Sequence, residues 1–225
     1  VNLNTICMDT KRILTWGGFI LGMAVLLIGL AKLGASPSVG GAKVGSNLSV
    51  AASDSDWSKG SKTAAHTIVE YSDFQCPACN SYFPLLKRLA EEHGNEVRVI
   101  YRHFPLDQIH PNARAAAWAA EAAGIQGKFF EMHDALFNTQ DSWGGDANPK
   151  IYFEDLAHSL GLDDAKFKAD MESQAVKDKV NTLAASGASS GVNSTPTLFF
   201  DGKLITNPSS YEELVSLVTT TSTQK

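Results

Sequence analysis

Residues 67–79 read TIVEYSDFQCPAC and place a short β-prone run immediately before a Cys-x-x-Cys motif. A helical pattern follows over residues 80–93, and Gly94 closes it. The next run, Val97–Phe104, alternates apolar and polar residues and ends before Pro105, which is typical of a second strand. A strand, a helix of about 15 residues and another strand form a βαβ unit, so we expect the two strands to be parallel.

The remainder of the folded part is predicted to be a helical insert, a hairpin and a closing helix. From about residue 111 to 191, apolar residues recur at helical spacing. Residues 195–206 read as two short strands with a tight turn at Asp201-Gly202, and residues 211–218 read as a last helix. The predicted fold class is therefore α/β, in the order βαβ, helical insert, ββ and α, over residues 66–225.

Composition excludes several classes of protein. The chain has 225 residues and a formal net charge of -5, which argues against a nucleic-acid binder with a basic face. Eleven Phe, five Tyr and four Trp can supply a hydrophobic core, so disorder is excluded as the main state. Three cysteines are too few for a small protein held together by disulfides.

The N-terminal part contains a long apolar run. Residues 13–31 carry no charge, and as a helix they would be roughly 28 Å long, close to the hydrocarbon thickness of a bilayer. Basic residues precede the run, so we expect residues 1–12 to be cytoplasmic, residues 13–33 to form a transmembrane anchor, and the rest to be extracytoplasmic. A cleaved signal peptide and a buried soluble helix are the alternatives.

Residues 34–65 link this run to the predicted domain. They are rich in Ser, Gly, Ala and Asp and lack hydrophobic periodicity. We therefore expect a flexible tether that lets the domain work at some distance from a membrane.

The chemistry of the predicted domain lies in Cys76-Pro77-Ala78-Cys79. A helix N-terminus favours a thiolate, Pro77 suits the first helical turn, and the spacing places Cys79 within reach of Cys76. We expect Cys76 to be the exposed, acidic thiol and Cys79 to be more buried. Half of a zinc site and a merely structural disulfide are the alternatives, whereas haem attachment is excluded because Asn80 replaces the required His.

Two residues outside the motif favour redox chemistry. Glu70 lies in the strand before Cys76, where burial would raise its pKa and make it a proton acceptor for Cys79. Its alternative is a strand-end residue that faces solvent. Pro196 lies in an apolar strand, which is unusual unless the Thr195–Pro196 bond is cis and the preceding backbone is free to pair with an extended substrate. A trans proline in an edge strand is the other possibility.

These features resemble the thioredoxin superfamily, and within it the DsbA-like thiol–disulfide oxidoreductases, particularly their membrane-tethered branch. The similarity covers about residues 67–218 and rests on the element order, on the helical insert and on the sequences EYSDFQC, CPAC, RHFPL and TP, which begin at Glu70, Cys76, Arg102 and Thr195.

The resemblance implies a thioredoxin fold with a helical insert and an extracytoplasmic dithiol oxidase. Its substrates would be exported proteins with reduced cysteines, and its reoxidising partner a membrane quinone reductase. Cys76 and Cys79 match the redox pair and its disulfide, Pro196 the cis-proline, and Glu70 the buried acid. Neither a metal nor another cofactor is implied. Substrate contacts are expected at three neighbouring residues, Thr195, Pro77 and Ala78.

One residue departs from the pattern of the best-known periplasmic oxidases, which have His where this chain has Ala78. Because Ala78 adds neither charge nor hydrogen bond, we expect the Cys76 pKa in the upper part of the range of roughly 3.5–7.5 for such thiols. A reductase or isomerase on the same fold, and a tethered chaperone that binds without turnover, are the alternative functions.

Overall fold

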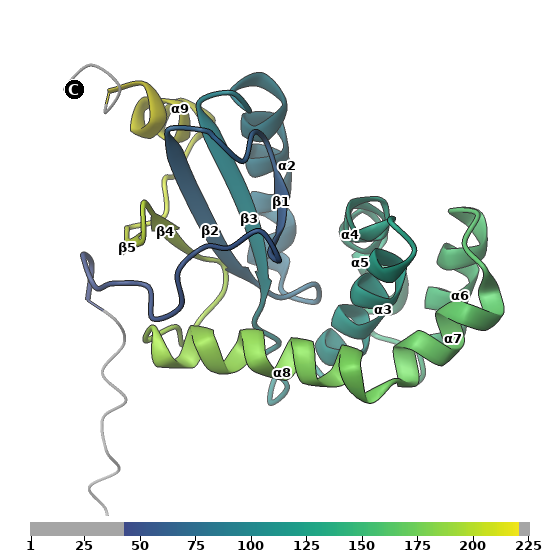
Figure 1. Ribbon diagram of the computed structural model, residues 1–225. Coiled ribbons are helices and arrows are strands. Elements are labelled where there is room, and N and C mark those ends of the chain that lie inside the picture. Colours follow the sequence, from purple (N-terminus) through teal and green to yellow (C-terminus); the bar gives the residue numbers. More distant parts are fainter. Residues whose placement is uncertain (1–42, 221–225) are drawn as a thin grey trace, which may run out of the picture. The chain divides into compact units, whose positions relative to one another are not determined.

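The computed structural model of the protein describes residues 43–220. Five strands of this part of the chain form one mixed sheet (Figure 1), in the order β1 (Trp57–Lys59), β3 (Val97–His103), β2 (His66–Ser72), β4 (Thr197–Phe200) and β5 (Lys203–Leu204). The central strands β2 (His66–Ser72) and β3 (Val97–His103) are parallel and are joined by helix α2 (Pro77–Glu92). The predicted βαβ unit is therefore confirmed.

The two faces of the sheet are covered by different elements. On one face, α2 and the last helix, α9 (Tyr211–Thr220), pack on strand residues such as Ile68 and Val99. On the other face lie Val69, Tyr71 and Ile100, together with Phe104. Helix α8 (Gln174–Ser189) passes close to this second face. A Cβ atom added to Gly187 would lie only 2.6 Å from a ring carbon of Phe104.

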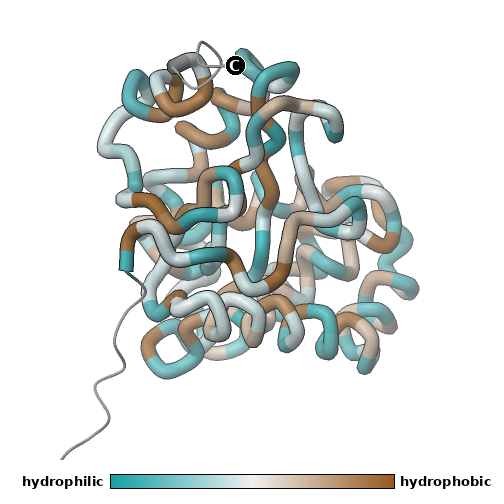
Figure 2. The backbone as a smooth tube through the Cα atoms, turned by 60° about the vertical axis from the view of Figure 1, so that its left-hand side comes forward, coloured by the Kyte–Doolittle hydropathy of each residue, from teal (hydrophilic) through white to brown (hydrophobic). Residues whose placement is uncertain are grey.

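Helices occupy the interval of the predicted insert. They are α3 (Ala113–Ile125), α4 (Phe129–Asn138), α5 (Gln140–Trp143), α6 (Lys150–Ser159), α7 (Asp164–Glu172) and α8 (Gln174–Ser189). Figure 1 shows α3 to α7 gathered at one side of the sheet, with α8 running from them beneath the strands. Figure 2 shows hydrophobic and hydrophilic positions mixed along the helical turns of the backbone, which is typical of helices with one buried face.

The chain returns to the sheet after the insert. Strand β4 (Thr197–Phe200) pairs antiparallel with β2, and β5 (Lys203–Leu204) pairs antiparallel with β4. The turn between them occurs at the predicted position, where Asp201 has a φ of 47° and Gly202 a φ of 78°. Together with α9, this hairpin completes the element order that the sequence predicts.

The expectation of a flexible tether over residues 34–65 is wrong for the part that the structure describes. Strand β1 (Trp57–Lys59) pairs antiparallel with β3 at the edge of the sheet. Further upstream, Ser49 donates a hydrogen bond of 2.9 Å to the carbonyl oxygen of Ser186 in α8. The segment has little regular structure, as its composition indicates, yet it packs on the domain. The folded domain therefore begins before residue 66.

The predicted cytoplasmic segment 1–12 and anchor 13–33 lie outside the described residues, as does the first part of the predicted tether. Within residues 43–220, the helices are too short or too polar to cross a membrane.

Candidate functional site

The Cys-x-x-Cys motif begins helix α2. Cys76 is the N-cap, with extended backbone angles (φ -75°, ψ 121°), and Pro77 occupies the first helical turn. Unpaired backbone N–H groups and the positive end of the helix dipole therefore surround the Cys76 sulfur. Pro77 and Ala78 are exposed, so a substrate can reach them.

Cys76 and Cys79 are free thiols in this structure, which therefore describes the reduced form of the predicted redox pair. Cys79 is fully buried, and Cys76 is also buried, with 7% of its surface exposed. The expectation that the Cys76 thiol is exposed is therefore corrected. The Cys76 Sγ atom lies 3.5 Å from the carbonyl oxygen of Thr195 and donates to it as a thiol. The loop before β4 covers Cys76. The sequence around Cys76 does not indicate this contact, because the loop is distant in the chain.

The two thiols have opposite acidities. The hydrogen bond from the Cys79 thiol contributes most to lowering the pKa of Cys76 to about 5, with further help from Thr195 and the backbone N–H groups of Cys79 and Ala78. That value lies below the upper part of the range expected from the sequence, because the sequence does not show that Cys79 and Thr195 stabilise the Cys76 thiolate. Burial, the hydrogen bond to Cys76 and the charge of Glu70 raise the pKa of Cys79.

The Thr195–Pro196 peptide bond is cis, as expected. It lies immediately before β4, and the Asn207 side chain donates a hydrogen bond of 2.7 Å to the carbonyl oxygen of Pro196. Thr195 is buried beside Cys76. Three predicted site residues from two distant parts of the chain, Cys76, Thr195 and Pro196, therefore meet at one place.

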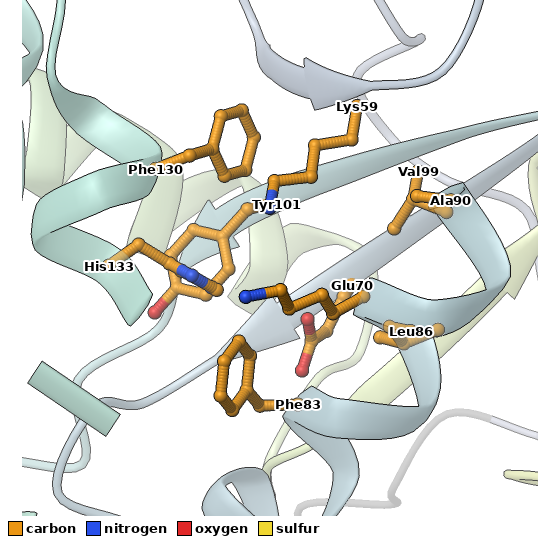
Figure 3. A pocket seen from close by; sticks show the side chains of 10 residues that line it. Lys59, Glu70, Phe83, Leu86, Ala90, Val99, Tyr101, Phe130 and His133 are labelled. Carbon is orange, nitrogen blue, oxygen red and sulfur yellow. The ribbon is translucent and has the colours of Figure 1, made fainter. Parts of the chain in front are cut away.

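Glu70 lies on the face of the sheet that α2 covers, as predicted, and not toward solvent. Its side chain lines a cavity of about 30 Å³ together with Phe83, Tyr101, His133 and Lys59 (Figure 3). Such a volume is enough for a water molecule. Burial, reinforced by the charge of Cys76, raises the pKa of Glu70 to about 7. The carboxyl group therefore titrates near neutral pH.

Glu70 is incompletely hydrogen-bonded. Within residues 43–220, Glu70 Oε1, the Ser72 hydroxyl and the Tyr101 hydroxyl are buried without a hydrogen-bond partner. Glu70 and Tyr101 are register partners in β2 and β3. Because such groups are costly to bury, this cluster is a candidate for proton transfer.

The residues that hold the segment before α2 were not predicted from the sequence. Gln140, from the helical insert, donates to the carbonyl oxygens of Phe74 (2.7 Å) and Cys76 (3.1 Å). The side-chain oxygen of Gln75 accepts from the backbone N–H of Asn112 at 2.7 Å. No local pattern signals these contacts, because the partners lie 37 to 66 residues apart in the chain.

The acidity of Cys76 gives a first testable prediction. The ultraviolet absorbance of the reduced protein should show a thiolate titration with a midpoint near pH 5, and Cys76→Ser should lose it. Ala78→His should lower the midpoint further, since it adds a hydrogen-bond donor or charge near the thiolate.

Cys79→Ala is the control for the cause of this acidity. It removes the largest contribution, so its midpoint should lie above that of the parent. A parent midpoint at or above about 8.5, the value of a free thiol, would contradict the electrostatic argument.

Comparison with known proteins agrees with this geometry. The sequence model of a family described as Thioredoxin matches residues 53–220. A thioredoxin-like oxidoreductase from Silicibacter pomeroyi DSS-3 superposes with a TM-score of 0.65 at 26% identity, covering 77% of this chain and 95% of that structure. The thiol-disulfide exchange protein alpha-DsbA2 from Wolbachia pipientis has a TM-score of 0.63 at 20% identity, over 74% and 87% of the two chains, and shares the fold.

Relatives found by sequence are named as antiporters and not as oxidoreductases. The Na(+)/H(+) antiporter NhaA 3 of Salinispora tropica is 35% identical over 165 residues, which are 73% of this chain and 24% of the antiporter. The chain thus spans about a quarter of the length of the curated relatives that it matches. The similarity indicates a shared domain, and it is not evidence that this chain transports ions.

Proposed function

Because the chain belongs to the thioredoxin family and has the fold of DsbA-like thiol–disulfide oxidoreductases, we propose that it is an extracytoplasmic dithiol oxidase. In this proposal, Cys76 and Cys79 form the redox pair and alternate between a disulfide and two thiols. Its substrates are exported proteins with reduced cysteines, to which it transfers its disulfide.

The proposal rests on one observation, the opposite acidity of two thiols at the N-terminus of α2. Cys76 has a pKa lowered to about 5, whereas the pKa of Cys79 is raised. A low pKa makes Cys76 a good leaving group and stabilises the reduced form, and a stabilised reduced form makes the disulfide more oxidising. This favours an oxidase over a reductase.

The reaction takes place in two exchanges. A substrate thiolate attacks the Cys76 sulfur of the disulfide, which breaks the Cys76–Cys79 bond and forms a mixed disulfide. Glu70 supplies a proton to Cys79 as that sulfur leaves. A second substrate thiolate then attacks the substrate sulfur of the mixed disulfide, so that the substrate is oxidised and the two thiols of the enzyme remain reduced.

The groups around the thiols have separate roles in this proposal. Thr195, Pro77 and Ala78 contact the substrate, and Pro196 keeps the backbone before β4 beside Cys76. Residues 13–33 anchor the protein, and a quinone-linked membrane reductase restores the disulfide. The exposure of Pro77 and Ala78 and the position of Thr195 support the substrate contacts.

A redox equilibrium with glutathione tests the direction of the reaction. We expect a potential less negative than about -200 mV, and catalysed oxidation of a reduced, unfolded protein that Cys76→Ser abolishes. A potential near about -270 mV would contradict the oxidase and favour a reductase. If Cys76→Ser still suppressed aggregation of that protein as well as the parent does, the chaperone alternative would be favoured.

A further inference from the structure

A groove lies beside Cys76, on the side of the loop that follows β3. It has a volume of about 670 Å³ and is lined by Cys76, by residues 104–110 and by residues 193–195. Volumes of this size are typical of ligand-binding pockets. His110 therefore lines the same groove as Cys76 and Thr195.

His110 is held in this wall by a buried carboxylate. Its Nδ1 donates a hydrogen bond of 2.8 Å to Asp73 Oδ2. Asp73 is 1% exposed and also accepts from the backbone N–H groups of Gln75 (2.7 Å) and Leu106 (2.9 Å). An ionised carboxylate only accepts hydrogen bonds, so Asp73 places the proton of neutral His110 on Nδ1 and leaves the Nε2 lone pair free.

The free nitrogen is accessible from the groove. The His110 side chain is 15% exposed, and Nε2 has no hydrogen-bond partner within residues 43–220. An imidazole that is oriented by a carboxylate and lines the same groove as a reactive sulfur has the features of a general base.

We propose that His110 removes the proton from the incoming substrate thiol, so that the thiolate forms within the groove. This role rests on the proposed thiol–disulfide exchange at Cys76. An alkyl thiol with a pKa of about 8.5 is only about 3% ionised at pH 7. A base at the site therefore accelerates the attack by at most about thirtyfold at that pH.

Formation of the mixed disulfide involves two proton transfers and one exchange of sulfur bonds. The proton of the substrate S–H passes to Nε2 of His110, and the substrate thiolate attacks the Cys76 sulfur. The Cys76–Cys79 bond breaks, its electron pair goes to the Cys79 sulfur, and that sulfur takes a proton from Glu70. The imidazolium of His110 then loses its proton to water, and Asp73 stabilises it in the meantime.

The charged groups around His110 agree with this role. Asp73 faces its Nδ1, and Asp107, which also lines the groove, is paired with Arg114. Cys76 lines the groove too, but it carries no charge while it is part of the disulfide. Among the titratable side chains that line the groove, which are Cys76, Asp107 and His110, His110 is therefore the one that can take up the substrate proton.

A stoichiometric reaction tests the proposal. The oxidised protein is mixed with a peptide that contains one cysteine, and formation of the mixed disulfide is followed from pH 5 to pH 9.5. His110→Gln should react roughly tenfold more slowly than the parent at pH 7, and the two rates should converge above pH 9, where the thiol ionises without help. The equilibrium constant with glutathione should change less than twofold, because a base alters rates only.

Two matched controls isolate the proton transfer. His158→Gln is the first control. The Nδ1 atom of His158 also bonds a carboxylate, at 3.0 Å from Asp164, but His158 is exposed and lies outside the groove. This variant should therefore react like the parent. A peptide with selenocysteine in place of cysteine is already ionised at neutral pH. Its reaction should therefore be equally fast with parent and His110→Gln.

Equal rates of parent and His110→Gln with the cysteine peptide at pH 7 would overturn the proposal. So would an equal loss with both peptides, because it would mean that His110 only shapes the groove. In His110→Ala, added imidazole should restore part of the rate, and a lack of restoration would also count against it. Failure of the parent itself to form any mixed disulfide would instead refute the proposed function.

Discussion

Replacing Glu70 with Gln should slow the resolution of a mixed disulfide by Cys79 roughly a hundredfold near neutral pH, with little effect on the attack by Cys76. Resolution requires the Cys79 thiol, whose pKa is raised, to lose its proton. Glu70 is the buried carboxyl group whose charge acts on that thiol, and its pKa of about 7 makes it a suitable acceptor. Gln has nearly the same shape and cannot accept the proton.

The charge of Cys76 adds timing to this transfer. The Cys76 thiolate helps to raise the pKa of Glu70. When Cys76 enters a mixed disulfide, that charge disappears, so the pKa of Glu70 falls and more of it is ionised. Glu70 thus becomes a readier acceptor at the moment when Cys79 has to be deprotonated.

Rapid mixing with an oxidised peptide, followed by acid quenching and mass spectrometry, separates the two steps. The mixed disulfide should accumulate in Glu70→Gln and not in the parent. Glu131→Gln, the same substitution at an exposed residue paired with Lys128, serves as the control and should behave like the parent. Equal resolution rates of Glu70→Gln and parent from pH 6 to pH 9 would rule out this role.

Unfolding experiments on the same variant provide an independent check. The pKa of Glu70 is about 7 in the folded protein and 4.5 ordinarily, so the folded state holds its proton longer. This contribution to stability is complete below about pH 4.5 and is lost as the pH rises through 7, by about 3 kcal/mol. Relative to the parent, Glu70→Gln should therefore gain stability between pH 5 and pH 8, as measured with urea.

Arg102→Met should destabilise the protein by about 3–5 kcal/mol, because it leaves a buried charge without its partner. The guanidinium group is 1% exposed and binds both carboxylate oxygens of Asp56, at 2.9 and 3.0 Å. It also donates to the carbonyl oxygens of Val50 (2.7 Å) and Ala51 (2.9 Å) and to the Tyr71 hydroxyl (3.2 Å). All five N–H donors of Arg102 are therefore used.

The effect should reach beyond the arginine itself. Burial would raise the pKa of Asp56, but the hydrogen bonds and charge of Arg102 outweigh it and hold that pKa below its ordinary value. Without Arg102, the carboxylate and two backbone carbonyl groups of the segment before β1 lose their partners. Hydrogen exchange should therefore show faster opening of residues 50–59 in the variant.

Urea unfolding of the reduced protein measures the predicted loss. Arg88→Met is the matched control, since Arg88 pairs with Glu92 on the surface, where its side chain is 55% exposed. Such a pair contributes about 1 kcal/mol or less. A loss for Arg102→Met as small as that of the control would show that the segment is held by other contacts.

The local elements around the motif follow from the sequence because their signals are local. A short β-prone run marks β2, alternation of apolar and polar residues marks β3, and the Cys-x-x-Cys motif marks the start of α2. The cis peptide bond was also predictable, because Pro196 interrupts an otherwise apolar strand. Glu70 was recognisable in a similar way, as an ionisable residue within a β-prone run, but its burial under α2 came from the structure.

Contacts between distant segments were not predictable in this way. The segment over residues 43–59 has the composition of a tether, yet Arg102 and the edge of β3 bind it to the domain. Nothing local tells that Asp56 meets an arginine 46 residues later in the chain. Composition reports the lack of regular structure in a segment, and it does not report whether the backbone polar groups of that segment find partners elsewhere.

The sequence by itself determined the order of the elements, the position of the two cysteines at a helix N-terminus, and the need for a special proline. Tertiary structure alone decided that Thr195 covers Cys76, that Cys79 lowers the pKa of Cys76 to about 5, and that Asp73 orients His110 beside the groove. The physical reason is that secondary structure depends on periodicities within a few residues, whereas acidity and orientation depend on neighbours that packing brings together from distant parts of the chain.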